Sequence, residues 1–260
     1  MSRPSSVGEV IIVGAGAGRL GFITVEGLEA LRTADVIIYD RLAPRGLLSH
    51  ARPGARLVYA GKAPGHHSMS QEDINDLLLR HAREGARVVR LKGGDPLFFG
   101  RGEEECLHVL RHGVRCRIIP GIPSPLALAS LYLVPLAGRG FSSSIAFATG
   151  TRSGGTPLGR DEIRRLLLSA DTVIFVMATR IYRDIVEEAA STRGPEEAVL
   201  VAEDLGGPGE RVWCTRAGSR EALLQRPSPP AIIVVGGAAR WAMENAERYA
   251  CSSSARTGRR

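Results

Sequence analysis

Short runs of apolar residues recur along the chain, and each is followed by a segment in which apolar residues return every three or four positions. Continuous apolar runs are typical of strands in a parallel sheet that helices cover on both faces. The first such unit is a strand at residues 9–14, a helix at 22–34 and a second strand at 35–40. The chain therefore begins with a β-α-β unit, and we predict an α/β protein.

The alternation of strands and helices continues to residue 237. Ser70 directly precedes one expected helix, and Asp73 lies three residues after Ser70. This is the spacing of a capping box. The further strands that we expect lie at residues 56–61, 87–95, 115–121, 144–151, 172–179, 198–205 and 231–237. Helices are expected between the strands, and in the first half they lie at residues 71–83, 103–111 and 124–133.

A Gly- and Ser-rich segment at residues 138–144 separates two series of strands. We therefore predict an N-terminal α/β domain at residues 7–138 and a C-terminal α/β domain at residues 139–240. Residues 241–260 end in a Ser-, Gly- and Arg-rich stretch, and we predict a flexible tail there. A chain of 260 residues is long enough for two domains that share a cleft.

The composition is that of an ordinary folded protein, with 44% hydrophobic and 23% charged residues. No run approaches the roughly 18 to 20 apolar residues that cross a bilayer, and the first residues lack the apolar run of a signal peptide. We therefore expect a cytoplasmic protein with no membrane partner. The four cysteines are far apart and form no CxxC pair, so we expect unpaired thiols and neither a disulfide framework nor a zinc site.

The formal net charge of +7 favours a polyanionic partner. Charge alone leaves nucleic acid and a small poly-carboxylate as alternatives. The sequence contains no recognisable nucleic-acid-binding motif. We therefore expect a small anionic substrate and no nucleic acid.

Gly16, Gly18 and Gly21 form a GxGxxG pattern directly after the first strand, and Asp40 ends the second strand. This pattern predicts a dinucleotide site, with pyrophosphate at the N-terminus of a helix, and hence an NAD(P)- or flavin-dependent oxidoreductase. The alternative is that the glycines allow a tight turn and the close approach of another ligand. The glycines alone do not decide between the two interpretations.

A series of longer motifs follows in a fixed order. The motifs are YDRL at residues 39–42, GKAPGHHSMSQEDIN at 61–75, VVRLKGGDPLFFGRGEEE at 88–105, IIPGIPS at 118–124, GRG at 138–140, Met177 and AIIVVG at 231–236. Over residues 9–237 they resemble the motifs of the tetrapyrrole methylase family, and within it those of the uroporphyrinogen III C-methyltransferases. A long block in the correct order is more specific than GxGxxG, so the resemblance outweighs the dinucleotide interpretation.

The resemblance implies a fold and a cofactor. The fold is the two-domain tetrapyrrole methylase fold, with a mostly parallel N-terminal sheet, a mixed C-terminal sheet and a cofactor cleft between them, in a homodimer. The cofactor is S-adenosylmethionine, which leaves as S-adenosylhomocysteine. The residues at the family's cofactor positions are Gly16, Ala17, Gly93, Gly94, Asp95, Phe98, Pro123, Ser124, Met177, Ala178 and Leu205.

Some of these residues have an alternative role. Asp95 can accept hydrogen bonds from amino or ribose groups of the cofactor, but an Asp before Pro is also a common turn former or N-cap. Met177 can pack beside the cofactor, but a Met at a strand end is often a core residue. Ala178 and Leu205 would contribute main-chain atoms only.

The resemblance also implies a reaction. A methyl group on a sulfonium is already activated, so the enzyme has chiefly to align an electron-rich atom with it and to exclude water. Methylation of a pyrrole carbon later releases a proton. Asp40 and Lys62 occupy the family positions proposed for proton acceptor and donor, with substrate positioning as the alternative, and Arg101 can influence proton removal. We predict methyl transfer to uroporphyrinogen III, which forms precorrin-2 for sirohaem or cobalamin synthesis.

An anionic macrocycle needs cations, and Arg offers paired donors that match a carboxylate. Arg41 and Arg139 occupy family positions for substrate binding, and His67 lies in a GxH segment that shapes the substrate pocket. His108 and His112 are four residues apart on an expected helix, but no third ligand follows at the usual spacing. We therefore expect no metal site.

The sequence departs from the family pattern around the expected cleft. Ala17 and Arg19 replace a proline and an aspartate of the first loop, so a carboxylate has become a cation and the local electrostatics are inverted. Pro123 stands where a threonine is usual, and Gly138 where a histidine is usual. The GGDP block is intact, so we expect cofactor binding to survive. The alternative function is methylation of a non-tetrapyrrole small molecule in specialised metabolism.

Overall fold

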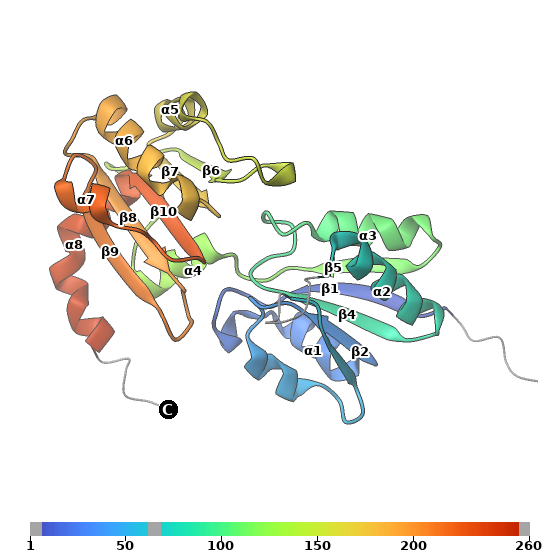
Figure 1. Cartoon of the computed structure of the whole chain (residues 1–260). Helices are drawn as coiled ribbons and strands as arrows, with labels where there is room; N and C mark the ends of the chain where they lie inside the picture. The colour runs from blue at the N-terminus through green and yellow to red at the C-terminus, as the bar shows by residue number, and fades with distance from the viewer. Residues whose placement is uncertain (1–6, 62–68, 255–260) are drawn as a thin grey trace, which may run out of the picture. The chain divides into compact units, whose positions relative to one another are not determined.

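The structure is a computed structural model that describes residues 7–61 and 69–254, with side chains as far as Asn245. The chain divides into two compact units, Met1–Ser124 and Pro125–Arg260. Each unit contains one five-stranded sheet, as Figure 1 shows. The α/β class and the presence of two sheets are confirmed.

The sheet of the first unit is entirely parallel. Its strands are β1 (Glu9–Gly14), β2 (Val36–Tyr39), β3 (Arg56–Tyr59), β4 (Arg87–Lys92) and β5 (Arg115–Ile119). The strand order is β3-β2-β4-β1-β5, and every neighbouring pair is parallel. The carboxyl ends of all five strands therefore meet at one edge.

Helices connect the strands of the first unit: η1 (Leu20–Phe22), α1 (Val25–Thr33), η2 (Arg45–His50), α2 (Gln71–Arg83) and α3 (Gly102–Arg111). The capping box before α2 is confirmed. The Ser70 hydroxyl oxygen accepts from the Asp73 amide at 3.0 Å, and the Asp73 carboxylate accepts from the Ser70 amide at 2.8 Å. α1 begins later than predicted, because Thr24 is its N-cap and accepts from the Gly27 amide at 3.1 Å.

Alternate residues of a strand face opposite sides of the sheet. Val10 and Ile12 of β1 pack with Leu78 of α2 on one side. Ile11 packs with Leu31 of α1 on the other side. Both faces are covered by helices, which explains why the strands are continuous apolar runs.

Cys106 of α3 and Cys116 of β5 form a disulfide, with their Cα atoms 5.7 Å apart. The prediction of unpaired thiols is wrong for these two residues. The chain turns at Gly113 after α3, and β5 then packs beside that helix, so cysteines ten positions apart meet. Cys214 is a free thiol whose pKa burial raises to about 11. The side chain of Cys251 lies outside the described side chains.

The sheet of the second unit is mixed, as the sequence predicts. Its strands are β6 (Ile145–Thr149), β7 (Thr172–Val176), β8 (Ala198–Glu203), β9 (Arg211–Arg216) and β10 (Ala231–Gly236). The order is β6-β7-β10-β8-β9, with β6 and β7 parallel and the other neighbours antiparallel. β9 is absent from the sequence prediction because its apolar run is only three residues long, at 212–214, and polar residues flank it.

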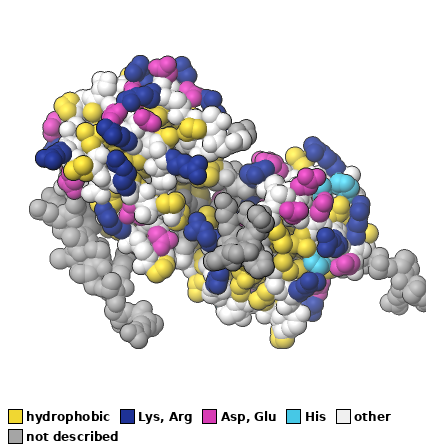
Figure 2. All heavy atoms as spheres, viewed as in Figure 1, with side chains coloured by type: hydrophobic (Ala, Val, Ile, Leu, Met, Phe, Trp, Pro, Cys, Tyr) yellow, Lys and Arg dark blue, Asp and Glu magenta, His cyan; other side chains and the backbone are white. Residues whose placement is uncertain are grey.

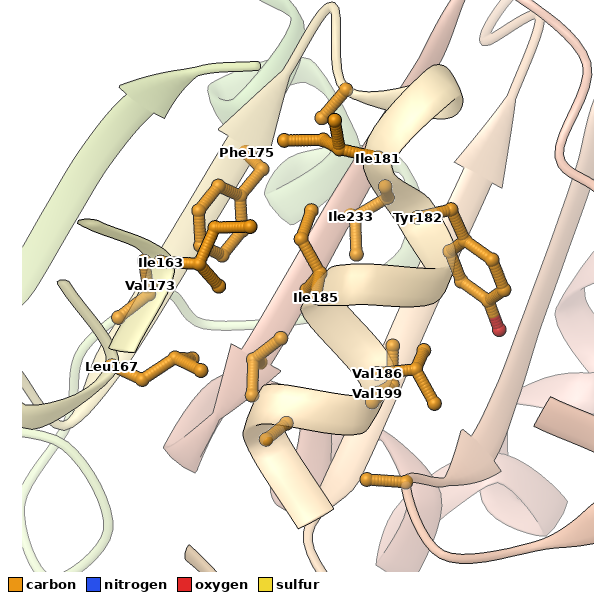
Figure 3. Packing of buried hydrophobic residues seen from close by; sticks show 14 of the residues in the cluster. Ile163, Leu167, Val173, Phe175, Ile181, Tyr182, Ile185, Val186, Val199 and Ile233 are labelled. Atoms are coloured by element: carbon orange, nitrogen blue, oxygen red, sulfur yellow. The ribbon is translucent and has the colours of Figure 1, made fainter. Parts of the chain in front are cut away.

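The helices of the second unit are α4 (Ser124–Tyr132), η3 (Ser153–Gly155), α5 (Arg160–Ser169), η4 (Thr179–Ile181), α6 (Tyr182–Arg193), α7 (Arg220–Leu224) and α8 (Gly237–Ser254). Figure 3 shows how Ile163 and Leu167 of α5 pack against Phe175 of β7 and Ile185 of α6. This cluster covers one face of the sheet.

Two boundaries differ from those read from the sequence. The units divide after Ser124, earlier than the predicted junction near residue 138. α4 therefore belongs to the second unit, where the Tyr132 hydroxyl at its end donates to Glu210. Residues 241–254, predicted as part of a flexible tail, continue α8, whose buried Ala238 and Ala242 lie where the helix contacts β8 and β10.

Among the described helices, none has the length and apolar character that a membrane crossing requires.

Candidate active site

The predicted cofactor residues of the first unit lie in the loops that leave the carboxyl edge of the parallel sheet. Gly16 and Ala17 follow β1. The segment from Gly93 to Phe98 follows β4, and Pro123 and Ser124 follow β5. In open α/β sheets this edge is where ligands bind.

Main-chain hydrogen bonds fasten these three loops into one corner. Gly16 and Gly94 exchange two bonds, from the Gly16 amide at 3.1 Å and from the Gly94 amide at 2.9 Å. The Ala17 amide donates to the Ile122 carbonyl oxygen at 3.1 Å, which adds the loop after β5. The structure thus brings these predicted residues together.

Glycine is required where the corner is tightest. Gly16 has a φ of +74°, and a Cβ atom there would lie 2.3 Å from Cβ of Phe22. A Cβ atom on Gly14 would lie 2.4 Å from the amide nitrogen of Gly121. The glycines therefore serve the close approach of the loops to one another.

Asp95 shapes this corner through its carboxylate. Its Oδ1 accepts from the amides of Leu97 at 2.8 Å and Phe98 at 3.1 Å, which is an Asx turn. Its Oδ2 accepts from the Gly121 amide at 3.2 Å and so connects the loops after β4 and β5. The turn-forming alternative for Asp95 is confirmed, and its contact with a cofactor stays a prediction.

The glycine pattern does not have the geometry of a pyrophosphate site. The amides of Gly16, Ala17 and Arg19 all donate to main-chain oxygens within the first unit. α1 begins only at Val25, and the side chain of Thr24 already caps its first turn. A pyrophosphate site needs free amides at a helix that starts directly after the glycines, so the dinucleotide alternative loses its physical basis.

Asp40 lies half-buried directly after β2. Its Oδ1 accepts from the amides of Leu42 at 3.0 Å and Ala43 at 3.1 Å. Its Oδ2 lies 3.4 Å from Nη2 of the buried Arg90. Three donors therefore fix the orientation of this carboxylate, and the neighbouring Arg41 is exposed.

Arg101 is the N-cap residue of α3 and has a left-handed backbone, with φ +59°. Its guanidinium makes two hydrogen bonds to Glu104, which raise the pKa of Arg101 above its ordinary value. A group that stays protonated influences a proton transfer by its charge and not by accepting the proton. Lys62 and His67, predicted for proton donation and substrate binding, lie outside the described residues.

The predicted residues of the second unit occupy three loops: the one after β7, the one after β8 and the turn at residues 138–142. Met177 follows β7 with a φ of +52°, and its side chain is 52% exposed, which contradicts the alternative that it is a core residue. Ala178 is fully buried and Leu205 is 9% exposed, in keeping with a contribution of main-chain atoms only. Arg139 is exposed in the turn that the paired Gly138 and Ser142 close.

The sequence profile described as Tetrapyrrole (Corrin/Porphyrin) Methylases matches residues 9–219 of this chain. The chain belongs to the tetrapyrrole methylase family. A uroporphyrinogen-III C-methyltransferase of Methanocaldococcus jannaschii is 37% identical over 88% of this chain and 96% of its own length. Siroheme synthase 2 of Pectobacterium atrosepticum is 36% identical over 88% of this chain, which spans 50% of that protein.

Solved structures of the family have the same fold. A uroporphyrin-III C-methyltransferase of Thermus thermophilus, crystallised with S-adenosylhomocysteine, has a TM-score of 0.76 to this chain. The two are 37% identical, and the match covers 90% of this chain and 100% of that one. The predicted tetrapyrrole methylase fold is confirmed.

One cluster in this tetrapyrrole methylase was missed by the sequence interpretation. Arg90 and Lys92 of β4 and Glu105 of α3 are charged and yet buried. Burial lowers the pKa of the Lys92 ammonium, and the charge of Arg90 lowers it further. Charged side chains are rarely buried, so their position inside the motif at residues 88–105 was the signal that could have singled them out.

The other expectations concern metal and nucleic acid. The His112 ring contacts the His108 carbonyl oxygen at 2.9 Å, and the described residues contain no group of three side chains able to hold a metal ion. On the face that Figure 2 shows, basic side chains of the second unit are spread among acidic and apolar ones and form no continuous stripe.

Proposed function

We propose that this tetrapyrrole methylase transfers a methyl group from S-adenosylmethionine to a pyrrole carbon of uroporphyrinogen III, which forms precorrin-2 for sirohaem or cobalamin synthesis. The observation that carries the proposal is the corner where Gly16, Gly94 and Asp95 fasten three loops at the carboxyl edge of the parallel sheet. Near full-length similarity to a relative named uroporphyrinogen-III C-methyltransferase supports the acceptor.

The corner suits a nucleoside ligand. Its glycines expose main chain, and at Gly94 a Cβ atom would meet nothing closer than 4.0 Å, so a ligand could approach the backbone there. Phe98 offers a half-buried ring beside it. Met177, which the family resemblance assigns to the cofactor, has an exposed thioether. Gly93, Ala17, Pro123, Ser124, Ala178 and Leu205 complete the proposed cofactor set.

Bound S-adenosylmethionine supplies a methyl group that is already activated on a sulfonium. The protein then has to hold the acceptor carbon in line and assist the later loss of its proton. Asp40 is the proposed proton acceptor, because two main-chain amides and Arg90 hold its carboxylate in one orientation. Lys62 is the proposed proton donor, and the permanent positive charge of Arg101 favours loss of the proton from the methylated ring, which is cationic until that proton leaves.

Cations bind the carboxylates of the proposed acceptor. Arg41 and Arg139 are exposed and can approach a ligand from solvent, and His67 is the third proposed substrate residue. We also propose that the enzyme works as a cytoplasmic homodimer, which rests on the family resemblance.

Calorimetry with S-adenosylhomocysteine and turnover with uroporphyrinogen III test the proposal together. We expect a saturable complex and a tetrapyrrole product that gains methyl mass. Tight S-adenosylhomocysteine binding with no methylated tetrapyrrole would favour the second candidate, a small-molecule methyltransferase for another acceptor. Arg19 in the first loop is the observation that favours this second candidate. No binding of S-adenosylhomocysteine would contradict both.

A further inference from the structure

Lysine is scarce in this chain. Only two of its 34 Lys and Arg residues are lysines, Lys62 and Lys92. A surface cation can be either residue, but a buried ammonium is a compact charge whose pKa shifts readily. In a chain that uses arginine for almost every cation, a buried lysine indicates a position that needs a compact ammonium and has no place for a planar guanidinium.

Lys92 is 6% exposed at the end of β4, and its Nζ lies 2.8 Å from Oε1 of Glu105. Glu105, in the first turns of α3, is fully buried. The same oxygen accepts from Nε of Arg90 at 3.3 Å and from Nε2 of Gln71 at 3.2 Å. One carboxylate oxygen therefore holds both buried cations of β4, Arg90 and Lys92.

The cluster is not explained by stability. Desolvation and the charge of Arg90 lower the pKa of Lys92, whereas Glu105 and Asp40 raise it. Apolar replacements of a buried ion pair are often neutral or stabilising. Val88, on the same face of β4, already packs in the apolar cluster with α2 and α3.

Two connections lead from Lys92 to the proposed active site. Its carbonyl oxygen accepts from the Ala15 amide at 2.7 Å, directly before the pair of Gly16 and Gly94. Its partner Glu105 also holds Arg90, whose Nη2 lies 3.4 Å from Oδ2 of Asp40. The main-chain bond joins Lys92 to the corner, and the bond from its ammonium to Glu105 anchors the same residue to α3 and, through Arg90, to the proposed proton acceptor.

We propose that Lys92 is a positioning residue of the methyl-transfer site and that it acts as a protonated lysine held by Glu105. Its ammonium fixes Glu105, Glu105 orients Arg90, and Arg90 orients the carboxylate of Asp40. The consequence for catalysis rests on the proposed function, but the state of the ammonium does not. The charged groups around Lys92 are Arg90 on β4, Asp40 after β2, and Glu104 and Glu105 on α3.

Cofactor affinity should depend on the proton of Lys92. Loss of that proton leaves Glu105 with Arg90 as its only cation. Affinity for S-adenosylhomocysteine should therefore fall in alkaline solution, at a pH below the value of about 10.4 at which an ordinary lysine titrates. Calorimetry over a pH series measures this fall in the wild-type enzyme.

Lys92→Met removes the charge at similar length, and we expect S-adenosylhomocysteine to bind on the order of tenfold more weakly, without the alkaline fall. Lys92→Arg keeps the charge but not its compact shape, and should also weaken binding. Arg83→Met, at an exposed position of α2, is the matched control that should keep the wild-type affinity and pH profile.

Nuclear magnetic resonance on ¹³C-labelled lysine gives a second readout, because the chain has only two lysines. Lys62→Arg assigns the signals. Glu105→Gln removes a charge that raises the pKa of Lys92, so the midpoint should move down. Arg90→Met removes a charge that lowers it, so the midpoint should move up. If the substitutions only loosened the structure, the titration midpoint of Lys92 would rise in both variants, toward the value of an ordinary lysine.

Two results would overturn the proposal. One is a Lys92 signal that titrates as an ordinary lysine in the wild type and does not respond to either variant. The other is a Lys92→Met enzyme that binds S-adenosylhomocysteine as the wild type does at every pH. Failure of the proposed function looks different, because the wild type would then not bind S-adenosylhomocysteine at all. If Lys92→Met does not fold, the wild-type titration still decides.

Discussion

Arg101 and Glu104 form a two-point ion pair across the first turn of α3, with Nε to Oε1 at 2.9 Å and Nη2 to Oε2 at 2.6 Å. Both side chains are about half exposed, at 55% and 47%. Arg101 also has a left-handed backbone. The pair therefore fixes the direction of one cation at the end of the block that carries the proposed cofactor site.

Glu104→Gln tests whether that direction matters for catalysis. Loss of one charged acceptor leaves the guanidinium free to rotate, so kcat/KM for uroporphyrinogen III should fall on the order of tenfold. Stability should change by less than about 1 kcal/mol, because exposed ion pairs contribute little. Arg32→Lys, in the comparable exposed pair of α1 with Glu29, is the control and should leave both quantities unchanged. An unaltered kcat/KM in Glu104→Gln would rule out an orienting role.

Asp95 offers a graded test of the corner. Asp95→Ala removes the acceptor of three amides, so the free energy of unfolding should fall by about 1–3 kcal/mol and S-adenosylhomocysteine should bind more weakly. Asp95→Asn keeps an oxygen for Leu97 and Phe98 but loses the acceptor for Gly121, so its effects should be intermediate. Urea unfolding and calorimetry measure the two effects. Equal affinities in all three proteins would contradict the assignment of this corner to the cofactor.

The disulfide between Cys106 and Cys116 predicts a thiol count. Denatured protein prepared without reductant should show two fewer reactive thiols than reduced protein, out of four cysteines. Reduction should lower stability by about 3 kcal/mol, because the bond closes a short loop in the unfolded chain. Cys214→Ser is the control, since it lowers both thiol counts by one and leaves their difference. Four reactive thiols without reductant would show that the bond does not form in the purified enzyme.

Asp171 predicts an acid dependence of stability in the second unit. The Ser143 amide donates to its carboxylate at 2.7 Å, and Ser144 adds further hydrogen bonds, so the pKa of Asp171 lies below its usual value. A carboxyl whose pKa is lowered by folding stabilises above its unfolded pKa of about 3.9, and that contribution disappears as the pH falls through the lowered value.

The wild type should therefore melt higher than Asp171→Asn at neutral pH, and the difference should vanish in acid. Thermal unfolding at several pH values measures it. Asp161→Asn, at a carboxylate that is 81% exposed, is the control and should show little difference at any pH. A difference between wild type and Asp171→Asn that persists in strong acid would mean that the Asn side chain clashes or packs badly.

The sequence predicted most of the fold because the strands are buried on both faces. β1, β7 and β10 are apolar runs whose existence needs no tertiary information. β9 was missed because Arg211–Arg216 mixes polar and apolar residues at a sheet edge. The end of α8 was missed because Ser, Arg and Gly at the end of the chain have the composition of a tail.

The candidate site was predicted in part. The motifs placed Gly94 and Asp95 in the loop after β4, and the structure joins that loop to the glycines after β1. The roles of charged residues were harder to predict, because whether Lys92 is solvated or buried depends on Glu105, which reaches it only after α3 packs on the sheet. The pairing of distant groups is a property of the packing and not of local composition.

The bonds between Gly16 and Gly94 join main-chain atoms alone. Their strength does not depend on which side chains stand at neighbouring positions such as Ala17 and Arg19. Substitutions at such positions can therefore accumulate without breaking the pair, as long as Gly16 stays a glycine. A cofactor site built on main-chain bonds can therefore stay the same while side chains around it change to suit a different methyl acceptor.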